Sequence, residues 1–124
     1  MTMHSSIAAA RISGPRREAD GTAVFEFRFG ADDPTFAGHF PTRPLLPGVF
    51  QLEMTRVAAE WALDCSLTIR EVCKAKFRRP ILPAEVVRVD LKLSEKDGTI
   101  HARAGFSVGG QPAGETLLLL ERNP

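Results

Sequence analysis

Apolar and polar residues alternate along several stretches of the chain, which is the pattern of strands with one buried face. The clearest case is the run of Phe25, Phe27 and Phe29, which Glu26 and Arg28 separate. Similar alternation, or a short apolar run, predicts further strands in residues 7–13, 73–78, 87–93, 100–108 and 117–121. Turn-forming residues separate the strands at Asp20-Gly21, Pro83, Asp97-Gly98 and Gly109-Gly110. The pattern therefore predicts about six strands.

One segment has the length and composition of a helix instead. Residues 49–63 are rich in apolar side chains over about four turns, and Pro47-Gly48 just before them suits a helix start. Because proline fixes φ, the repeat of Pro41, Pro44 and Pro47 predicts a stiff loop that leads into this helix. We therefore expect an α+β fold in which an antiparallel sheet of about six strands surrounds one long central helix.

Length and composition limit the possible classes of protein. The chain has 124 residues, which fits a single domain over residues 1–124. It contains 44% hydrophobic and 25% charged residues, which indicates a protein with a core rather than a disordered one. The net charge of +1 argues against a nucleic-acid partner, and no stretch approaches the ~20 apolar residues of a membrane-spanning helix. We expect a cytoplasmic protein whose cysteines, Cys65 and Cys73, are reduced core thiols.

The proline-rich loop and the helix start carry the candidate chemistry. His39 lies in the loop, and it is either a surface residue or a base, since imidazole takes up a proton near neutral pH. Gly48 would place an unpaired backbone N–H at the positive end of the helix dipole, where it stabilises a carbonyl oxygen gaining negative charge. Glu53 lies about one and a half turns further on. Either it faces water or pairs with Arg56, or burial raises its pKa so that it acts as a general acid.

These residues belong to a longer motif, Gly38-His39-Phe40-Pro41-x-x-Pro44-x-x-Pro47-Gly48-Val49-x-x-x-Glu53. The motif resembles the signature of the β-hydroxyacyl-acyl carrier protein dehydratases of the hot-dog fold, with the same separation between histidine and carboxylate. A second segment, residues 76–85, resembles the strand-turn-strand that follows the helix in that family. The resemblance covers most of the chain from about residue 22 onward.

The resemblance implies a hot-dog fold and a reaction that needs no cofactor or metal. A 3-hydroxyacyl thioester, linked to an acyl carrier protein, loses water and becomes a trans-2-enoyl thioester. In the family the histidine removes the α-proton, the carboxylate protonates the departing hydroxyl, and the glycine amide polarises the thioester carbonyl. These roles fall on His39, Glu53 and Gly48. Glutamate rather than aspartate at the acid position favours dehydration without isomerisation of the double bond.

The resemblance also implies partners and contact residues. The family's site is shared between two subunits, so we expect a homodimer, alone or as a trimer of dimers. The residues expected to contact the acyl substrate are Phe40, Pro47, Val49, Phe50 and Val57. The residues expected to attract an acidic acyl carrier protein are Arg43, Lys74, Lys76, Arg78 and Arg79. The last four also suit a solvated strand face, and neither a nucleic acid nor a membrane is expected as a partner.

Two departures from the family leave the pathway open. Val57 stands where the family's helix commonly has glutamine, and the segment that usually precedes the first long strand is expected to be absent or much shortened. Because both differences affect the acyl tunnel, fatty-acid synthesis and a specialised polyketide or polyene pathway are both compatible with the chain. Two other functions are alternatives: a hot-dog acyl thioesterase, which would have little need of His39, and a non-catalytic hot-dog subunit that supports an active partner.

Overall fold

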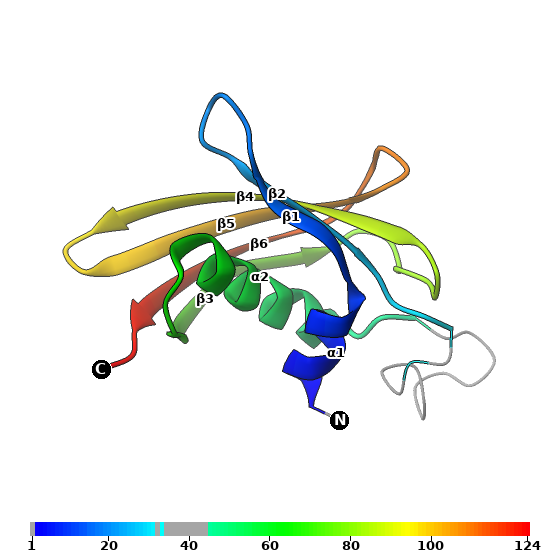
Figure 1. Ribbon diagram of the computed structural model, residues 1–124, viewed down its shortest axis with the longest axis horizontal. Helices are drawn as coiled ribbons and strands as arrows, with labels where there is room; N and C mark the ends of the chain where they lie inside the picture. Colours follow the sequence, from blue (N-terminus) through cyan, green and yellow to red (C-terminus); the bar gives the residue numbers. More distant parts are fainter. Residues whose placement is uncertain (1, 32, 34–44) are drawn as a thin grey trace.

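A six-stranded antiparallel sheet that curves around one long helix is the frame of the protein (Figure 1). The computed structural model describes residues 2–31, 33 and 45–124. The sheet consists of β1 (Arg11–Arg17), β2 (Ala23–Arg28), β3 (Leu67–Phe77), β4 (Val86–Lys96), β5 (Thr99–Val108) and β6 (Gln111–Arg122). The helices in the described part of the chain are α1 (Met3–Ala10) and α2 (Gly48–Leu63). This is the hot-dog arrangement that the sequence predicts.

The order of the strands in the sheet differs from their order in the chain. Neighbouring strands run β1-β2-β4-β5-β6-β3, and every pair is antiparallel. The predicted turns at Asp20-Gly21, Asp97-Gly98 and Gly109-Gly110 each join neighbouring strands. The segment around Pro83 is different, because it leads from β3 at the edge of the sheet to β4 in its interior. One edge of β3 therefore pairs with β6, and the other has no strand partner among the described residues.

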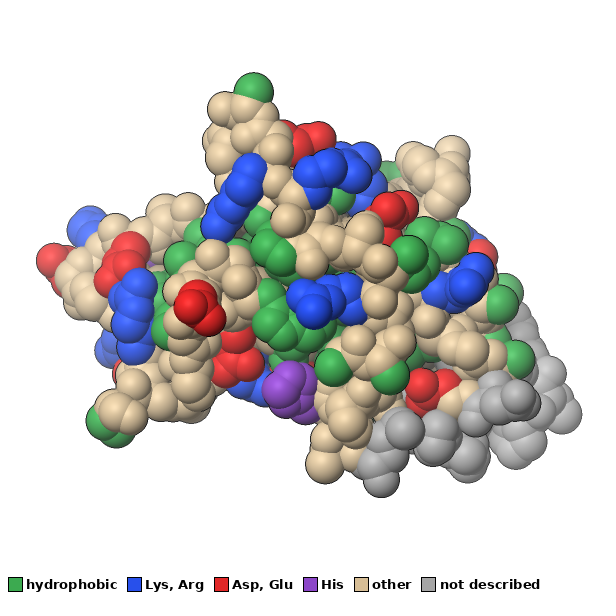
Figure 2. Space-filling view, viewed as in Figure 1, with side chains coloured by type: hydrophobic (Ala, Val, Ile, Leu, Met, Phe, Trp, Pro, Cys, Tyr) green, Lys and Arg blue, Asp and Glu red, His purple; other side chains and the backbone are tan. Residues whose placement is uncertain are grey.

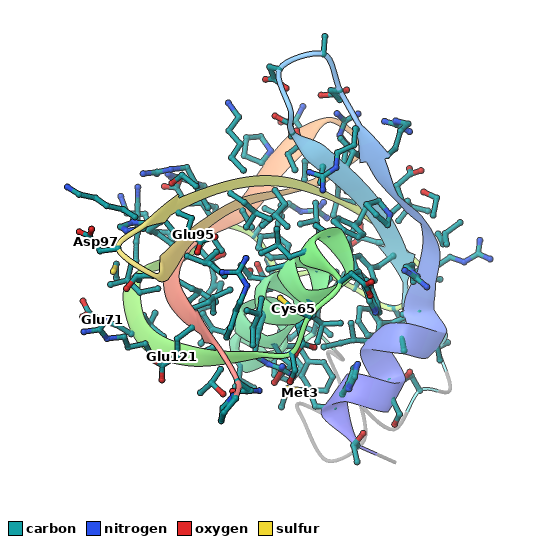
Figure 3. All side chains as sticks on the ribbon, turned by 60° about the vertical axis from the view of Figure 1, so that its left-hand side comes forward. Met3, Cys65, Glu71, Glu95, Asp97 and Glu121 are labelled. Atoms are coloured by element: carbon teal, nitrogen blue, oxygen red, sulfur yellow. The ribbon has the colours of Figure 1, made fainter. Side chains whose placement is uncertain are left out.

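α2 confirms the helix predicted for residues 49–63, and the sheet curves around it (Figure 3). Aromatic rings join the helix to β2. The ring centroid of Trp61 lies 6.0 Å from that of Phe25 and 6.2 Å from that of Phe27. Near the start of the helix, Phe50 meets Phe29 edge to face at 6.2 Å. The buried residues of α2 are Gln51, Met54, Thr55, Val57, Ala58 and Ala59.

The N-terminal segment is helical where the sequence predicts a strand. The prediction of a strand over residues 7–13 is wrong at its start, because α1 continues to Ala10 before β1 begins. Ile7 and Ala10 are buried at helical spacing, and Thr2 caps the helix by accepting a hydrogen bond from the Ser5 N–H at 3.0 Å. The alanines in this segment also favour a helix over a strand. Neither described helix is long and apolar enough to cross a membrane.

β3 is less buried than its alternating pattern predicts. Val72 and Phe77 are 45% and 48% exposed. Cys73 is also exposed, so its expected place in the core is wrong, while Cys65 is half-buried and both thiols are free. Cys73, Ala75 and Phe77 alternate with basic residues as in a half-buried strand, but in a single protomer all three are open to solvent.

The pairing of β3 with β6 is also irregular. Register shifts occur between Ile69 and Glu71, and again between Val72 and Lys74. Irregularities of this kind bend a strand and increase its local twist. They lie on the strand whose outer edge is open.

Candidate active site

A pocket lies where the chain enters α2, and backbone hydrogen bonds hold its walls together. The Leu46 N–H donates to the carbonyl oxygen of Ile81 at 2.8 Å, and the Arg78 N–H donates to that of Ala113 at 2.8 Å. The first bond fixes the segment before α2 against the segment after β3, and the second fixes that later segment against β6. The pocket has a volume of about 250 Å³. The described residues that line it are Leu45, Leu46, Gly48, Gln51, Phe77, Arg78, Arg79 and Pro80.

Gly48 is the first residue of α2, which confirms its predicted place at a helix start. Pro47 occupies the N-cap position, and it makes no side-chain hydrogen bond to the first turn. The first backbone N–H groups of a helix have no partners within the helix, and they lie at the positive end of its dipole. Because Gly48 lines the pocket, the pocket lies beside the positive end of this dipole, which favours an oxygen that gains negative charge.

Phe77 covers one side of this helix start. A β-carbon added at Gly48 would lie 2.6 Å from Cε2 of Phe77, which is closer than real β-carbons approach other atoms. Figure 1 shows the end of β3 beside the start of α2. Any side chain at residue 48 would therefore push the ring of Phe77 or fill the pocket.

Gln51 is a site residue that the sequence analysis missed. Its side chain lines the pocket and is only 2% exposed. Its Oε1 is buried and has no hydrogen-bond partner among the described residues. The available signal was its position, since Gln51 follows Gly48 by three residues and shares a helix face with the apolar Met54 and Ala58. A polar residue on the buried face of a helix is a candidate for a specific role.

Glu53 pairs with Arg56, which is one of the alternatives that the sequence leaves open. Arg56 donates to Glu53 Oε1 and lies 2.8 Å from Glu60 Oε2. Arg56 also donates to the carbonyl oxygen of Leu67 at 3.0 Å, so three acceptors hold it. The side chain of Glu53 is 23% exposed in the protomer. It is therefore not fully buried, as the general-acid alternative would require.

Gly48 and Glu53 lie on different sides of α2. Five residues correspond to about 140° around a helix and ~7.5 Å along its axis. Glu53 is accordingly not among the described residues that line the pocket, whereas Gln51, about 60° from Gly48, is among them. Gly48 and Glu53 of one protomer therefore do not line this pocket together.

Three predicted residues lie outside the part of the chain that the structure describes. They are the candidate base His39, the acyl-contact residue Phe40 and the carrier-contact residue Arg43. Their roles stay predictions from the sequence.

The other predicted acyl-contact residues, Pro47, Val49, Phe50 and Val57, lie at or after the start of α2. Val49 is 52% exposed, and Val57 has no exposed surface because it lies in the core. None of the four is among the described residues that line the pocket. The structure does not bring them together with Gly48 in that pocket.

The predicted basic cluster, Lys74, Lys76, Arg78 and Arg79, lies beside the pocket. Arg78 and Arg79 line it directly. Their side chains are 52% and 34% exposed, so the guanidinium groups lie at its outer rim. Figure 2 shows that basic and acidic side chains are interspersed on the face drawn there. Part of the cluster therefore lies at the rim of the pocket.

Acidic residues that the sequence analysis missed are paired with this cluster. Glu115 Oε1 lies 2.8 Å from Lys74 Nζ and 3.1 Å from Arg78 Nη2. Glu85 Oε2 lies 2.9 Å from Arg79 Nη2. The hydrogen bond from Lys74 lowers the pKa of Glu115, and Arg78 adds to the effect. Because β6 lies beside β3, only the sheet topology reveals this neighbour.

Comparisons with known proteins identify the family. The model of the ApeI-like family, described as ApeI dehydratase, matches residues 15–111. A 3-hydroxyacyl-[acyl-carrier-protein] dehydratase FabZ of Natranaerobius thermophilus is 35% identical over 104 residues, covering 74% of this chain and 72% of that protein. The protein of the same name from Anaeromyxobacter sp. (strain K) is 30% identical over 95 residues, covering 68% of this chain and 61% of that protein. The chain thus spans about three fifths of the length of several such relatives.

Solved structures share the fold. The Dehydratase Heterocomplex ApeI:P from Xenorhabdus doucetiae contains a chain with a TM-score of 0.77 and 24% identity, covering 90% of this chain and 96% of that chain. A hypothetical thioesterase with coenzyme A from Streptococcus pneumoniae TIGR4 has a TM-score of 0.72 at 8% identity, covering 98% and 94%. These likenesses bear on the fold alone, whereas the family model covers most of the sequence. The chain belongs to the ApeI-like dehydratase family.

Proposed function

We propose that the protein removes water from a 3-hydroxyacyl thioester carried on an acyl carrier protein, giving a trans-2-enoyl thioester. The observation that carries the proposal is the pocket at the start of α2, which Gly48 lines and which Phe77 covers on one side. Membership of the ApeI-like family and the printed names of the FabZ relatives support the same reaction.

Each proposed role follows from the chemistry of its residue. His39 takes the proton from C2, and the electrons of that bond move toward the thioester oxygen, which accepts a hydrogen bond from the Gly48 N–H. The electrons then form the C2–C3 double bond while the C3–O bond breaks. Glu53 gives its proton to the departing hydroxyl, which leaves as water. No electrons leave the substrate, so the reaction needs no oxidant.

The proposed site is shared between two copies of the chain. Glu53 lies on the side of α2 away from Gly48, so a partner's glutamate is the simpler source of the acid. The open edge of β3 and the exposed Val72 and Phe77 offer a surface on which a second copy would be buried. A homodimer, alone or as a trimer of dimers, is therefore part of the proposal.

An acyl carrier protein is the proposed source of the thioester. Arg78 and Arg79 at the pocket rim, with Lys74 and Lys76 on β3, would attract an acidic carrier and the phosphate of its prosthetic group. A cytoplasmic location belongs to the same proposal, because both cysteines are free and free thiols persist in reducing compartments. The pathway can be fatty-acid synthesis or a specialised acyl pathway.

The deciding experiment uses the purified protein alone with a 3-hydroxyacyl thioester. The formation of the conjugated enoyl product is followed by absorbance, and the release of free thiol is measured in parallel. We expect enoyl product and a near-complete loss of it in His39→Ala. Thiol release that survives His39→Ala would instead indicate a thioesterase.

A supporting subunit is the second candidate, and the name of the Xenorhabdus neighbour, a dehydratase heterocomplex, is the observation that favours it. In that case the purified protein would form neither product, even at high protein concentration. Activity that appears only when a second hot-dog protein is added would establish this alternative.

A further inference from the structure

Gln51 has a buried hydrogen-bond acceptor that no described residue uses. The side chain is 2% exposed, and Oε1 has no partner among the described residues. Its surroundings are close-fitting, since a β-carbon added at Gly114 on β6 would lie 2.8 Å from this oxygen. The absence of a side chain at Gly114 therefore leaves room for the amide group between α2 and the sheet.

A neighbouring residue shows that buried polar groups on this helix can find partners. Thr55 is fully buried one turn after Gln51. Its hydroxyl donates to the carbonyl oxygen of Gln51 at 2.9 Å, and it lies 2.7 Å from the hydroxyl of Thr116 on β6. An unpaired buried acceptor destabilises a protein, whereas an apolar side chain of the same shape would not. The oxygen of Gln51 is therefore better explained by a ligand than by the fold.

The pocket presents three kinds of chemical group. Arg78 and Arg79 stand at its exposed rim, Gly48 is half-buried, and Gln51 is buried. A phosphopantetheine arm carries matching groups, namely an anionic phosphate, amides with N–H donors, and the thioester carbonyl. The rim suits the phosphate, and the helix start suits the carbonyl.

The spacing along α2 agrees with this ligand. Gln51 lies three residues after Gly48, or about 4.5 Å along the axis, and helix side chains lean toward the N-terminus. In the arm, a sulfur and an ethylene group separate the thioester carbonyl from the nearest amide nitrogen. Because Gln51 lines the same pocket less than one turn after Gly48, its side chain is at a suitable spacing to meet that nitrogen.

We propose that Oε1 of Gln51 accepts a hydrogen bond from the amide N–H of the pantetheine arm nearest the thioester. This inference rests on the proposed function, because it assumes that the pocket receives an acyl thioester. Gln51 is then a positioning residue: it aligns the thioester carbonyl with the Gly48 N–H and takes no part in proton transfer. The 3-hydroxyl of the acyl group is the competing donor, and the experiment separates the two.

The test compares two substrates with the same 3-hydroxyacyl group. One is the N-acetylcysteamine thioester, which keeps the arm's amide, and the other is its analogue with CH₂ in place of the amide N–H. We expect Gln51→Met to lower kcat/KM about tenfold on the first substrate and to leave it unchanged on the second. An equal loss on both substrates would mean that Gln51 contacts the 3-hydroxyl or only shapes the pocket, and it would overturn the inference.

A folding control uses Thr55→Val on the same helix. We expect Gln51→Met to keep or raise the Tm, because it removes an unpaired acceptor, and Thr55→Val to lower it by several degrees. Thr55→Val should also leave the ratio of kcat/KM between the two substrates unchanged. If Gln51→Met instead lowered the Tm as much as Thr55→Val and weakened both substrates equally, the residue would be structural and the inference wrong.

A binding measurement separates failure of this inference from failure of the proposed function. The probe is a saturated acyl N-acetylcysteamine thioester, which cannot lose water, paired with its CH₂ analogue. Roughly tenfold weaker binding of the amide probe to Gln51→Met, with the analogue unaffected, would support the inference even if the protein dehydrates nothing. Equal binding of both probes to both proteins, or no binding at all, would overturn it.

Discussion

Gly48 and Phe77 are in direct contact, although they come from the start of α2 and the end of β3. A β-carbon at residue 48 would lie 2.6 Å from Cε2 and 2.9 Å from Cζ of Phe77. These atoms belong to the outer part of a side chain that is 48% exposed, so the ring is able to move. The contact joins the helix start that carries the proposed oxyanion donor to the strand whose edge is open.

Gly48→Ala is the first test of this contact. The added methyl group would displace the ring of Phe77 and move the bound thioester, so we expect kcat/KM to fall roughly 100-fold. The free energy of unfolding should fall by about 1–2 kcal/mol, because the methyl group overpacks the contact. Enzyme assays and chemical unfolding of the same samples would measure both effects.

The control for this prediction is the same substitution in a Phe77→Ala background. Without the ring, alanine at residue 48 should be neutral or stabilising by up to ~1 kcal/mol, since alanine suits a helix better than glycine. An identical cost in both backgrounds would show that the two residues do not touch.

Mixing two inactive variants tests whether the site is shared. His39→Ala and Glu53→Gln should each be inactive alone, because each lacks one proton-transfer group. If the groups come from different subunits, random exchange makes half of the dimers mixed, and each mixed dimer has one intact site of two. Activity should then recover to about one quarter of the wild-type value. Mixtures that stay inactive after confirmed subunit exchange would contradict a shared site.

Val72→Arg tests β3 as the dimer interface. An arginine at this position of the proposed interface would be desolvated without a partner, so we expect a monomer by light scattering and activity that falls with the fraction of dimer. The matched control is Ile12→Arg on β1, since Ile12 is 52% exposed and lies on the opposite edge of the sheet. If Ile12→Arg dissociated the dimer and Val72→Arg did not, the interface would lie on β1, and the prediction for β3 would be wrong.

Glu115→Gln tests the role of the basic cluster in carrier binding. Glu115 pairs with both Lys74 and Arg78, so its removal frees two cations beside the pocket. We expect an acyl carrier protein to bind roughly 2–5-fold more tightly, and the gain should shrink as salt rises. Glu95→Gln is the matched control, because it frees Arg122 at the opposite end of the sheet (Figure 1). Equal gains in the two variants would indicate a general charge effect rather than a docking site.

The same variant predicts a change in acid stability. The pKa of Glu115 is lowered from its ordinary value of 4.5, chiefly by the hydrogen bond from Lys74. The interaction therefore stabilises the fold above that ordinary value and is lost as the pH falls through the lower folded pKa. The difference in unfolding free energy between the wild type and Glu115→Gln should shrink as the pH falls below about 4.5. A difference that stays constant from pH 6 to pH 3 would contradict the pairing.

The periodicity of apolar residues predicted those helices and strands that bury one face against the core. α2 and strands β2, β4 and β5 follow from periodicity, because each buries one face against the core. The strand predicted for residues 7–13 is wrong at its start, because an isoleucine followed by alanines favours a short helix there. The position of β3 beside β6 could not be predicted, because side-chain alternation reports faces and not neighbours.

The candidate site divides in the same way. The place of Gly48 followed from the Pro-Gly pair before an apolar segment. The pairing of Glu53 with Arg56 was one of two open alternatives, because helical spacing allows it without requiring it. The unpaired oxygen of Gln51 and the pairing of Glu115 with Lys74 depend on how distant segments pack, which no local pattern reports.

The register shifts on β3 affect which other chains can pair with its open edge. A smooth open edge would accept any extended chain, including nascent or misfolded ones. The irregularities between Ile69 and Glu71 and between Val72 and Lys74 interrupt the regular spacing of backbone groups. An added strand needs that regular spacing to form its hydrogen bonds. Only a strand with compatible kinks would fit along its whole length. In the proposed dimer, β3 of the second copy would be such a strand, so the irregularity would favour pairing of identical chains over aggregation.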